Sequence, residues 1–262
     1  MSFKAYKLAD ILRTAVGAPV SHRHTTAIIA AAGSSTRMGS NVSKLLLEVD
    51  GIPVLARTLI AHQLADTVDE IVLIARREDF DTYLALAKQY AITKLKRITT
   101  GGSSRQESVL HGFEAVSQKT EFVAISDGAR CLVTPDMIDM VNQTAWKHDA
   151  ACAATPATDT IKLANDKGYT KKNAPERESV WLAQTPQTFA LPLYRAAAYY
   201  AKENDYTATD DAALVEAIGR RVKLVDSGKE NIKITTPADL YLAKAILQRR
   251  ADEHTKKDGD KA

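Results

Sequence analysis

Hydrophobic residues fall into short strand-like runs that alternate with longer helical patterns. The apolar, β-branched runs that predict strands are Thr26–Ala31, Glu70–Ala75, Lys94–Thr99, Phe122–Ser126 and Ala150–Thr155. The amphipathic patterns that predict helices lie between them, at Val54–Ala65, Asp79–Tyr90, Arg105–Val116 and Thr134–Lys147. Because strands and helices alternate, we expect an α/β fold with a mostly parallel sheet and helices on both faces.

The alternation breaks between Asp159 and Gln184. Two β-like patches there flank a turn at Asn165–Gly168, which predicts a protruding β-hairpin, called the arm, over about residues 158–184. One chain would cover the apolar residues of the arm poorly; these residues are Ile161, Leu163, Val180, Trp181 and Leu182. We therefore expect a homodimer formed through the arm.

After the arm the pattern predicts three helices and two strands. The helices are Leu193–Glu203, Asp210–Ile218 and Ala238–Arg249, and the strands are Arg221–Val225 and Ile232–Thr235. No linker divides the chain, so residues 25–250 are expected to form one domain. Residues 1–24 form an N-terminal extension without an assigned role, and the charged residues 251–262 are expected to be a disordered tail.

Composition excludes several classes of protein. Hydrophobic residues make up 45% and charged residues 26%, which is ordinary for a globular protein, and no apolar run approaches the roughly 18 residues of a membrane span. The formal net charge of +3 is too small, and too evenly spread, to indicate a nucleic-acid partner. The two cysteines, Cys131 and Cys152, form neither a metal-binding spacing nor a disulfide framework, so we expect a cytoplasmic protein without a membrane anchor.

Candidate chemistry begins directly after the first predicted strand. Ala31, Ala32 and Gly33 open a loop of small residues, and Arg37 and Lys44 follow it. Small side chains let a polyphosphate approach backbone N–H groups, and the two cations supply fixed positive charge. The spacing matches neither the P-loop nor the dinucleotide-binding fingerprint. An ordinary turn that carries two cations is the alternative.

Four more polar clusters follow later strands, where ligands bind in an open parallel sheet. They are Gly101 to Arg105 with Ser108 on the next helix, Ser126 to Arg130, Asp159 and Thr160 with Arg177 and Thr185 across the arm, and Lys233 within Asn231–Thr235. Asp127 could hold the water shell of a metal ion or a ribose hydroxyl, and Arg130 could bind a phosphate. Each cluster alone also fits an ordinary turn or a solvated strand edge.

The sequence lacks a nucleophile constellation. None of the six histidines pairs recognisably with a serine or cysteine, and no G-x-S-x-G elbow occurs. Positioning and charge neutralisation, as in phosphoryl or nucleotidyl transfer, fit the collected cations better.

Taken in order, these motifs resemble the 2-C-methyl-D-erythritol 4-phosphate cytidylyltransferase family. The residues that carry the resemblance are Ala31-Ala32-Gly33, Arg37-Met38-Gly39, Lys44, Gly101-Gly102 with Arg105 and Ser108, Asp127-Gly128-Ala129-Arg130, Asp159-Thr160, Thr185-Pro186-Gln187 and Asn231-Ile232-Lys233. The resemblance runs from about Thr26 to Arg249. The chain departs from the usual family pattern at Ser43, where proline is usual, at Ser103 and Ser104, where an acidic residue is common, and in Ser126 to Cys131, where His-Asp-Ala-Ala-Arg-Pro is usual.

The resemblance implies a Rossmann-like nucleotidyltransferase fold and an enzyme of non-mevalonate isoprenoid synthesis. Its substrates would be CTP and methylerythritol phosphate, its cofactor Mg²⁺, and its assembly a homodimer through the arm. Arg37 and Lys44 would stabilise the transition state, and Arg177 and Lys233 would hold the methylerythritol phosphate group. The implied substrate-binding residues are Ala31, Ala32, Gly33, Gly101 and Ser108 for CTP, Asp127 near ribose and metal, and Arg130, Asp159, Thr160 and Thr185.

Two other functions remain open from the sequence. A cytidylyltransferase for ribitol or another polyol 5-phosphate would share most of these motifs. A catalytically silent nucleotide-binding protein would also keep the fold, although mere binding would hardly need Arg177 and Lys233. A dinucleotide-dependent oxidoreductase is disfavoured, because its fingerprint does not follow the first strand.

Overall fold

A computed structural model describes residues 21–33 and 43–259, so that Arg37, residues 1–20 and residues 260–262 lie outside the described residues. The strands are β1 (Thr25–Ala30), β2 (Glu48–Val49), β3 (Ile52–Pro53), β4 (Glu70–Ala75), β5 (Leu95–Thr100), β6 (Phe122–Asp127), β7 (Ala150–Pro156), β8 (Trp181–Ala190) and β9 (Lys223–Asp226). The α-helices are α1 (Val54–Leu64), α2 (Phe80–Gln89), α3 (Arg105–Glu114), α4 (Pro135–His148), α5 (Leu191–Glu203), α6 (Asp211–Ala217) and α7 (Pro237–Gly259).

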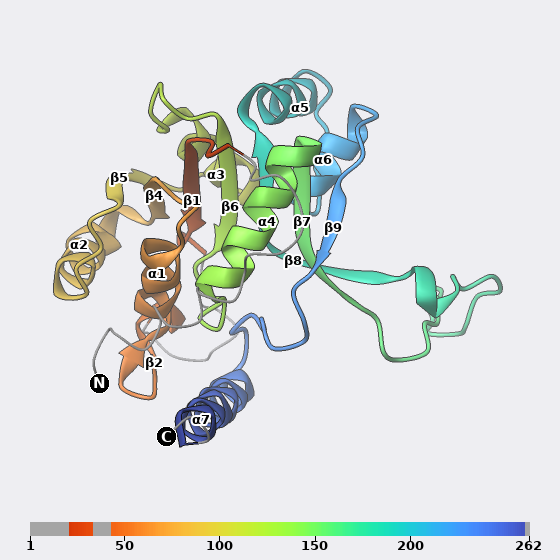
Figure 1. Cartoon of the computed structure of the whole chain (residues 1–262). Helices are drawn as coiled ribbons and strands as arrows, with labels where there is room; N and C mark the ends of the chain where they lie inside the picture. Colours follow the sequence, from red (N-terminus) through yellow and green to blue (C-terminus); the bar gives the residue numbers. More distant parts are fainter. Residues whose placement is uncertain (1–20, 34–42, 260–262) are drawn as a thin grey trace.

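The central sheet has the strand order β5-β4-β1-β6-β8-β7-β9. Strands β5, β4, β1 and β6 pair in parallel, as do β7 and β9, whereas β8 runs antiparallel to both of its neighbours. Helices cover both faces (Figure 1). The predicted α/β architecture with a mostly parallel sheet is therefore confirmed.

Strand β1 separates the two halves of the hydrophobic core. Its alternate residues Ala27 and Ile29 pack on the side of α1 and α2, while Ile28 packs on the side of α3, α5 and α6. This follows from the two-residue period of a strand, which sends successive side chains to opposite faces. The burial of β1 on both faces therefore fixes the position of Ala31 at its carboxyl end.

Strand β8 is the main difference between the structure and the sequence prediction. The sequence analysis assigned the first residues of β8 to the arm and predicted no strand over the rest. The strand begins in the arm at Trp181 and then crosses the sheet between β6 and β7. Pro186 and a run of polar residues argue against a central strand in the sequence. In the structure side-chain hydrogen bonds satisfy those buried polar groups: Thr188 Oγ1 donates to Asn142 Oδ1 at 2.7 Å, and Gln187 Nε2 donates to Asp210 Oδ2 at 2.9 Å.

The arm is a hairpin, as predicted, and it projects from the sheet (Figure 1). Lys171 N donates to Leu163 O at 2.7 Å across the hairpin, and Gly168 takes the positive φ of 82° that its turn requires. Leu163, Trp181 and Leu182 are exposed on the arm. As predicted, a single chain leaves apolar residues of the arm exposed to solvent.

Two other predictions differ from the structure. Ile232–Thr235 is not a strand: Ile234 N donates to Ala129 O at 2.9 Å, which ties the segment to the loop after β6 rather than to a sheet edge. Helix α7 continues to Gly259, so the expectation of disorder from residue 251 is wrong for residues 251–259. Between residues 238 and 258 no glycine or proline interrupts the helix, and Arg249 pairs with Glu253 one turn later.

No helix among the described residues is long and apolar enough to span a lipid bilayer.

Candidate active site

The small-residue loop after β1 lies against the glycine loop after β5. Ala31 N donates to Ile74 O at 2.8 Å, and Gly101 N donates to Ala75 O at 3.0 Å, so both loops are tied to β4. They approach so closely that a Cβ added to Gly101 would lie 2.5 Å from the Cβ of Ala32. The structure therefore brings together Ala31, Ala32 and Gly101, which the sequence analysis assigned to one ligand.

The glycine loop is held by its own serines. Ser104 caps α3, because its hydroxyl accepts the backbone N–H of Glu107 at 3.1 Å. The Ser108 hydroxyl accepts the N–H of Gly102 at 2.9 Å and donates to the Ser104 carbonyl at 2.7 Å. Ser103 donates through both its N–H and its hydroxyl to Glu107, and these bonds lower the pKa of the Glu107 carboxyl. Ser108 thus shapes the loop at the predicted substrate site.

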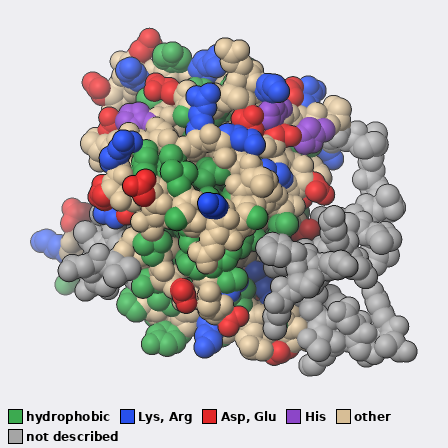
Figure 2. All heavy atoms as spheres, turned by 90° about the vertical axis from the view of Figure 1, so that its left-hand side faces the viewer, with side chains coloured by type: hydrophobic (Ala, Val, Ile, Leu, Met, Phe, Trp, Pro, Cys, Tyr) green, Lys and Arg blue, Asp and Glu red, His purple; other side chains and the backbone are tan. Residues whose placement is uncertain are grey.

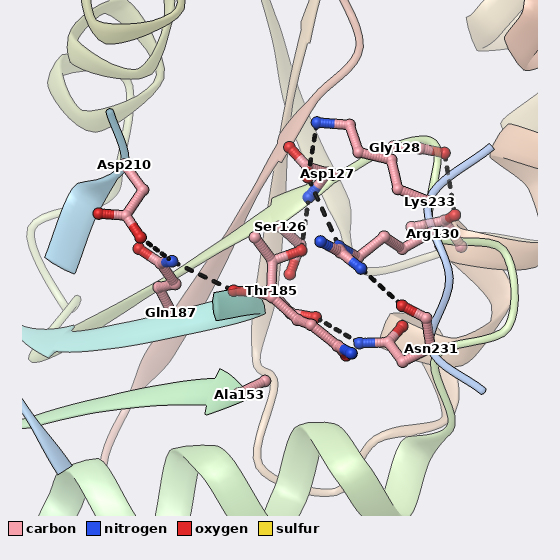
Figure 3. A network of polar contacts seen from close by, with 12 residues as sticks. Ser126, Asp127, Gly128, Arg130, Ala153, Thr185, Gln187, Asp210, Asn231 and Lys233 are labelled. Atoms are coloured by element: carbon pink, nitrogen blue, oxygen red, sulfur yellow. Dashed lines mark hydrogen bonds and ion pairs between the residues drawn. The ribbon is translucent and has the colours of Figure 1, made fainter. Parts of the chain in front are cut away.

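Asp127, the last residue of β6, is the centre of a cluster of cations (Figure 3). Its Oδ2 atom lies 2.9 Å from Lys233 Nζ and 3.5 Å from Arg130 Nε. Its Oδ1 atom lies 3.9 Å from Arg105 Nε. Burial acts to raise the pKa of Asp127, but Lys233, Arg105 and Arg130 outweigh it and hold the pKa below its usual range. The carboxylate is therefore ionised in a site of net positive charge.

Backbone contacts fix this cluster where three segments meet (Figure 3). Asp127 N donates to Thr185 Oγ1 at 3.0 Å, which links β6 to β8. Asn231 Nδ2 donates to the Thr185 carbonyl at 2.9 Å, and Arg130 Nη1 donates to the Asn231 carbonyl at 2.5 Å. Asp127, Arg130, Thr185 and Lys233 were predicted site residues, and the structure brings all four together.

A neutral histidine lies behind the cluster. His62, on α1, is fully buried, and burial lowers its pKa to about 4. Its Nδ1 lies 2.8 Å from the Thr58 carbonyl, which can only accept, so Nδ1 carries the proton. Nε2 then accepts from the Ser126 hydroxyl at 3.0 Å. His62 thereby fixes the residue directly before Asp127 without adding charge.

A second buried carboxylate holds the cation nearest the glycine loop. Arg105 begins α3, and its Nη2 donates to Asp211 Oδ2 at 2.6 Å. The other oxygen of Asp211 accepts the Tyr194 hydroxyl at 2.8 Å. Burial raises the pKa of Asp211 above its usual range, although Arg105 and Tyr194 oppose that rise. The sequence analysis missed Asp211 and Tyr194. The one signal in the sequence was that Asp210 and Asp211 stand at the start of a predicted helix.

The remaining predicted residues lie on a short 3₁₀ helix, on the arm or outside the described residues. Lys44 begins the short 3₁₀ helix Lys44–Leu46 and is half-buried. Asp159, Thr160 and Arg177 are exposed on the arm, where Arg177 pairs with Glu178 at 3.1 Å. Arg37 is outside the described residues, and Gly33 is the last described residue before that gap.

This arrangement is suited to binding phosphates. Lys233, Arg130 and Arg105 gather around one carboxylate, at the carboxyl end of a parallel sheet and beside loops of small residues. Among residues 21–33 and 43–259, no group of three or more His, Cys, Asp and Glu side chains could hold a metal by itself. Mg²⁺ commonly needs only one or two carboxylates when substrate phosphates complete its shell, and Asp127 fits that donor set.

The comparison with protein families decides the identity. A family model described as IspD, 2-C-methyl-D-erythritol 4-phosphate cytidylyltransferase, matches residues 25–249. This chain belongs to that family. It is 42% identical over 226 residues to the cytidylyltransferase of this name from Thermosynechococcus vestitus, covering 86% of this chain and 96% of that protein. The protein of the same name from Nostoc punctiforme is 40% identical, with coverage of 85% and 98%.

Solved structures of cytidylyltransferases share the fold. The 4-diphosphocytidyl-2C-methyl-D-erythritol synthase of Anaerococcus prevotii superposes with a TM-score of 0.78 at 32% identity, covering 87% of this chain and 98% of that one. The 2-C-methyl-D-erythritol 4-phosphate cytidylyltransferase of Thermus thermophilus has a TM-score of 0.68 at 30% identity, with coverage of 86% and 99%. The expected nucleotidyltransferase fold and enzyme class are therefore confirmed for this cytidylyltransferase.

Proposed function

We propose that this chain transfers the cytidylyl group of CTP to 2-C-methyl-D-erythritol 4-phosphate, in non-mevalonate isoprenoid synthesis. The products are 4-diphosphocytidyl-2-C-methyl-D-erythritol and pyrophosphate. The observation that carries this proposal is the family match over residues 25–249, which includes the whole Asp127 cluster. Relatives named for the same reaction match most of the chain at about 40% identity, which favours methylerythritol phosphate over ribitol 5-phosphate as the acceptor.

The reaction needs positioning and charge neutralisation more than a protein nucleophile. An oxygen of the methylerythritol phosphate attacks the α-phosphorus of CTP, the bond from that phosphorus to the bridging oxygen breaks, and pyrophosphate leaves with the bond electrons. The backbone N–H groups of Ala32 and Gly33 are proposed to cradle the triphosphate. Those of Gly101, Gly102 and Ser103 are bonded within the protein and shape the neighbouring glycine loop. Arg37 and Lys44 are proposed to stabilise the negative charge on the reacting phosphate. Lys233 is proposed to hold the acceptor phosphate.

Asp127 is the proposed protein ligand of Mg²⁺. It is ionised, ends β6 and lies among cations that also attract phosphates. Bound Mg²⁺ would neutralise charge on the triphosphate and the departing pyrophosphate. Arg130 is held by the Asn231 carbonyl and lies 3.5 Å from Asp127 Oδ2, so it is proposed to keep the Asp127 carboxylate in place.

The arm is proposed to form a homodimer and to carry Arg177 to the site of the second subunit. Arg177 is exposed on the arm, which projects away from the Asp127 cluster of its own chain (Figure 1). The exposed Leu182 and Trp181 would gain cover in the same contact. Both cysteines are free and buried, which supports the proposed cytoplasmic setting.

The proposed function is tested by pyrophosphate release with Mg²⁺ and CTP, using methylerythritol 4-phosphate and ribitol 5-phosphate as alternative acceptors. We expect release with the first acceptor and at least about 100-fold less kcat/KM with the second, because a site built for one acceptor leaves polar groups unpaired with another. Equal release with ribitol 5-phosphate would contradict the choice of acceptor. Binding of CTP without release with either acceptor would contradict the enzymatic assignment.

A further inference from the structure

Asp211 competes with Asp127 for the Arg105 guanidinium. Arg105 Nη2 lies 2.6 Å from Asp211 Oδ2, a short charge-assisted hydrogen bond, whereas Arg105 Nε lies 3.9 Å from Asp127 Oδ1, beyond hydrogen-bond length. Asp211 therefore draws the guanidinium away from that oxygen of Asp127.

Asp211 is itself firmly held. It is 1% exposed and begins α6, while its second oxygen accepts the hydroxyl of the buried Tyr194 from α5. The neighbouring Asp210 caps α6 by accepting Ala213 N at 2.9 Å, and Gln187 Oε1 accepts Ala212 N at 2.8 Å. A carboxylate fixed by two helices and β8 can hold a partly exposed arginine in one place.

The other two cations around Asp127 are held differently. Lys233 Nζ pairs at 2.9 Å with Asp127 Oδ2, and Arg130 approaches the same oxygen. Both lie on the Oδ2 side, and Arg105 is the cation of the cluster that faces Oδ1. An arginine released from Asp211 would need to move only about 1 Å to hydrogen-bond with Oδ1, given ordinary N–H···O lengths.

We propose that Asp211 is a positioning residue that, through Arg105, keeps Oδ1 of Asp127 available to the divalent cation that accompanies the nucleotide. Tyr194 supports it by orienting the Asp211 carboxylate. This inference rests on the proposed function, because it concerns the binding of Mg²⁺ and CTP at Asp127.

Asp211→Asn separates this role from a general effect on stability. The amide keeps the size of the side chain but loses the charge that retains Arg105, so the guanidinium closes on Asp127. We expect Mg·CTP, titrated by calorimetry without acceptor, to bind about tenfold more weakly than to the wild type, and higher Mg²⁺ to restore the binding. Wild type that fails to bind Mg·CTP would overturn the proposed function and this inference together.

The double variant Asp211→Asn/Arg105→Gln is the control. It leaves neither buried charge unpaired and removes the guanidinium that would close on Asp127. We expect it to bind Mg·CTP within about threefold of the single variant Arg105→Gln, because Asp211 acts only through Arg105, whereas a merely structural role of Asp211 would weaken binding in both backgrounds. A loss of Mg·CTP binding from Asp211→Asn that is as large in the Arg105→Gln background as in the wild type would overturn the inference, and so would wild-type binding by Asp211→Asn.

Tyr194→Phe provides a second test if Asp211→Asn does not fold. It removes one hydroxyl and keeps both charges, so its effect should have the same sign and be smaller, about twofold to threefold in Mg·CTP binding. Restoration of this loss by raised Mg²⁺ would support the inference. Binding indistinguishable from wild type would overturn it.

Discussion

At the scale of single residues, the site depends on which buried side chains are charged and which are neutral. Asp127 is 10% exposed and stays ionised because Lys233, Arg130 and Arg105 surround it. His62 lies behind the same strand and stays neutral because burial disfavours its charged form. The pKa values of both groups lie below their ordinary values, for Asp127 because of the surrounding cations and for His62 because of burial. The shift of His62 is the easier one to measure.

The His62 pKa predicts a loss of stability in mild acid. Its pKa is about 4 in the folded chain against 6.5 as the ordinary value, so the unfolded chain binds more protons between these limits. The stabilisation is complete above pH 6.5 and is lost as the pH falls toward 4. The expected loss from this group is about 2 kcal/mol between pH 7 and pH 5. Urea unfolding of the wild type and of His62→Gln at both pH values measures it, and equal pH dependence in the two proteins would refute the assignment.

Gly101 predicts a steric effect at the nucleotide loop. A methyl group at Gly101 would meet the Cβ of Ala32 at 2.5 Å, so Gly101→Ala should force the two loops apart and weaken CTP binding at least about tenfold. Gly102→Ala is the comparison, because the three atoms nearest to its added methyl all belong to the exposed and flexible Glu107 side chain, not to the loop at Ala32. Calorimetric titration measures the affinity of both variants for CTP. Equal affinities would show that the two loops can separate without weakening CTP binding, which would contradict the prediction.

Sequence could identify residues with a chemical signature but not their partners. Asp127 and Arg130 follow an apolar strand and carry charge, so their placement at the sheet edge could be predicted. Lys233 was also predicted as a site residue, but on a strand that the structure does not contain. Asp211 and Tyr194 could not be predicted, because one opens a helix and the other lies in an amphipathic pattern with no sign of what it contacts. Their role depends on α5 and α6 packing beside α3, which only the fold shows.

At the scale of elements, β8 joins the arm to the site. The same strand exposes Trp181 and Leu182 in the arm and buries Thr185 beside Asp127. The parallel strands were predicted because apolar β-branched runs mark them. Strand β8 was missed because its polar side chains are typical of a loop, whereas in the structure Thr188 and Gln187 donate hydrogen bonds to Asn142 and Asp210. The segment Ile232–Thr235 was mistaken for a strand because apolar alternation alone cannot show whether a partner strand exists.

The arm predicts a subunit interface centred on Leu182. This side chain is 54% exposed, and Leu182→Asp would place a charge in a contact that excludes water. We expect this variant to sediment as a monomer at micromolar concentration and to lose activity, since the proposed site needs Arg177 from the other chain. Leu84→Asp on α2 is a matched control, because Leu84 is 45% exposed and lies on a separate element. Sedimentation of both variants as the wild type would refute the interface.

At the scale of the whole molecule, charge is distributed so that phosphate-binding groups gather at the carboxyl ends of the parallel strands. Figure 2 turns the left-hand side of Figure 1 toward the viewer and shows acidic and basic side chains mixed along the top of this face, with apolar side chains across its middle. The net charge of the chain is only +3. The order of the motifs along the chain was enough to predict the family. In an open α/β sheet the carboxyl ends of the parallel strands lie at one edge, so motifs that follow successive strands meet there. The order of the motifs does not show how two subunits would be arranged, so the homodimer through the arm stays a proposal.

The central claim is that the Asp127 cluster performs cytidylyl transfer, and the most direct test is pyrophosphate release from CTP and methylerythritol 4-phosphate by Asp127→Asn. The amide keeps the shape of the side chain but removes the charge that Lys233 and the proposed Mg²⁺ require, so kcat/KM should fall at least about 100-fold. Asp226→Asn at the end of β9 is the control, and it should retain wild-type activity. Near-normal release by Asp127→Asn, with the control unchanged, would contradict the account.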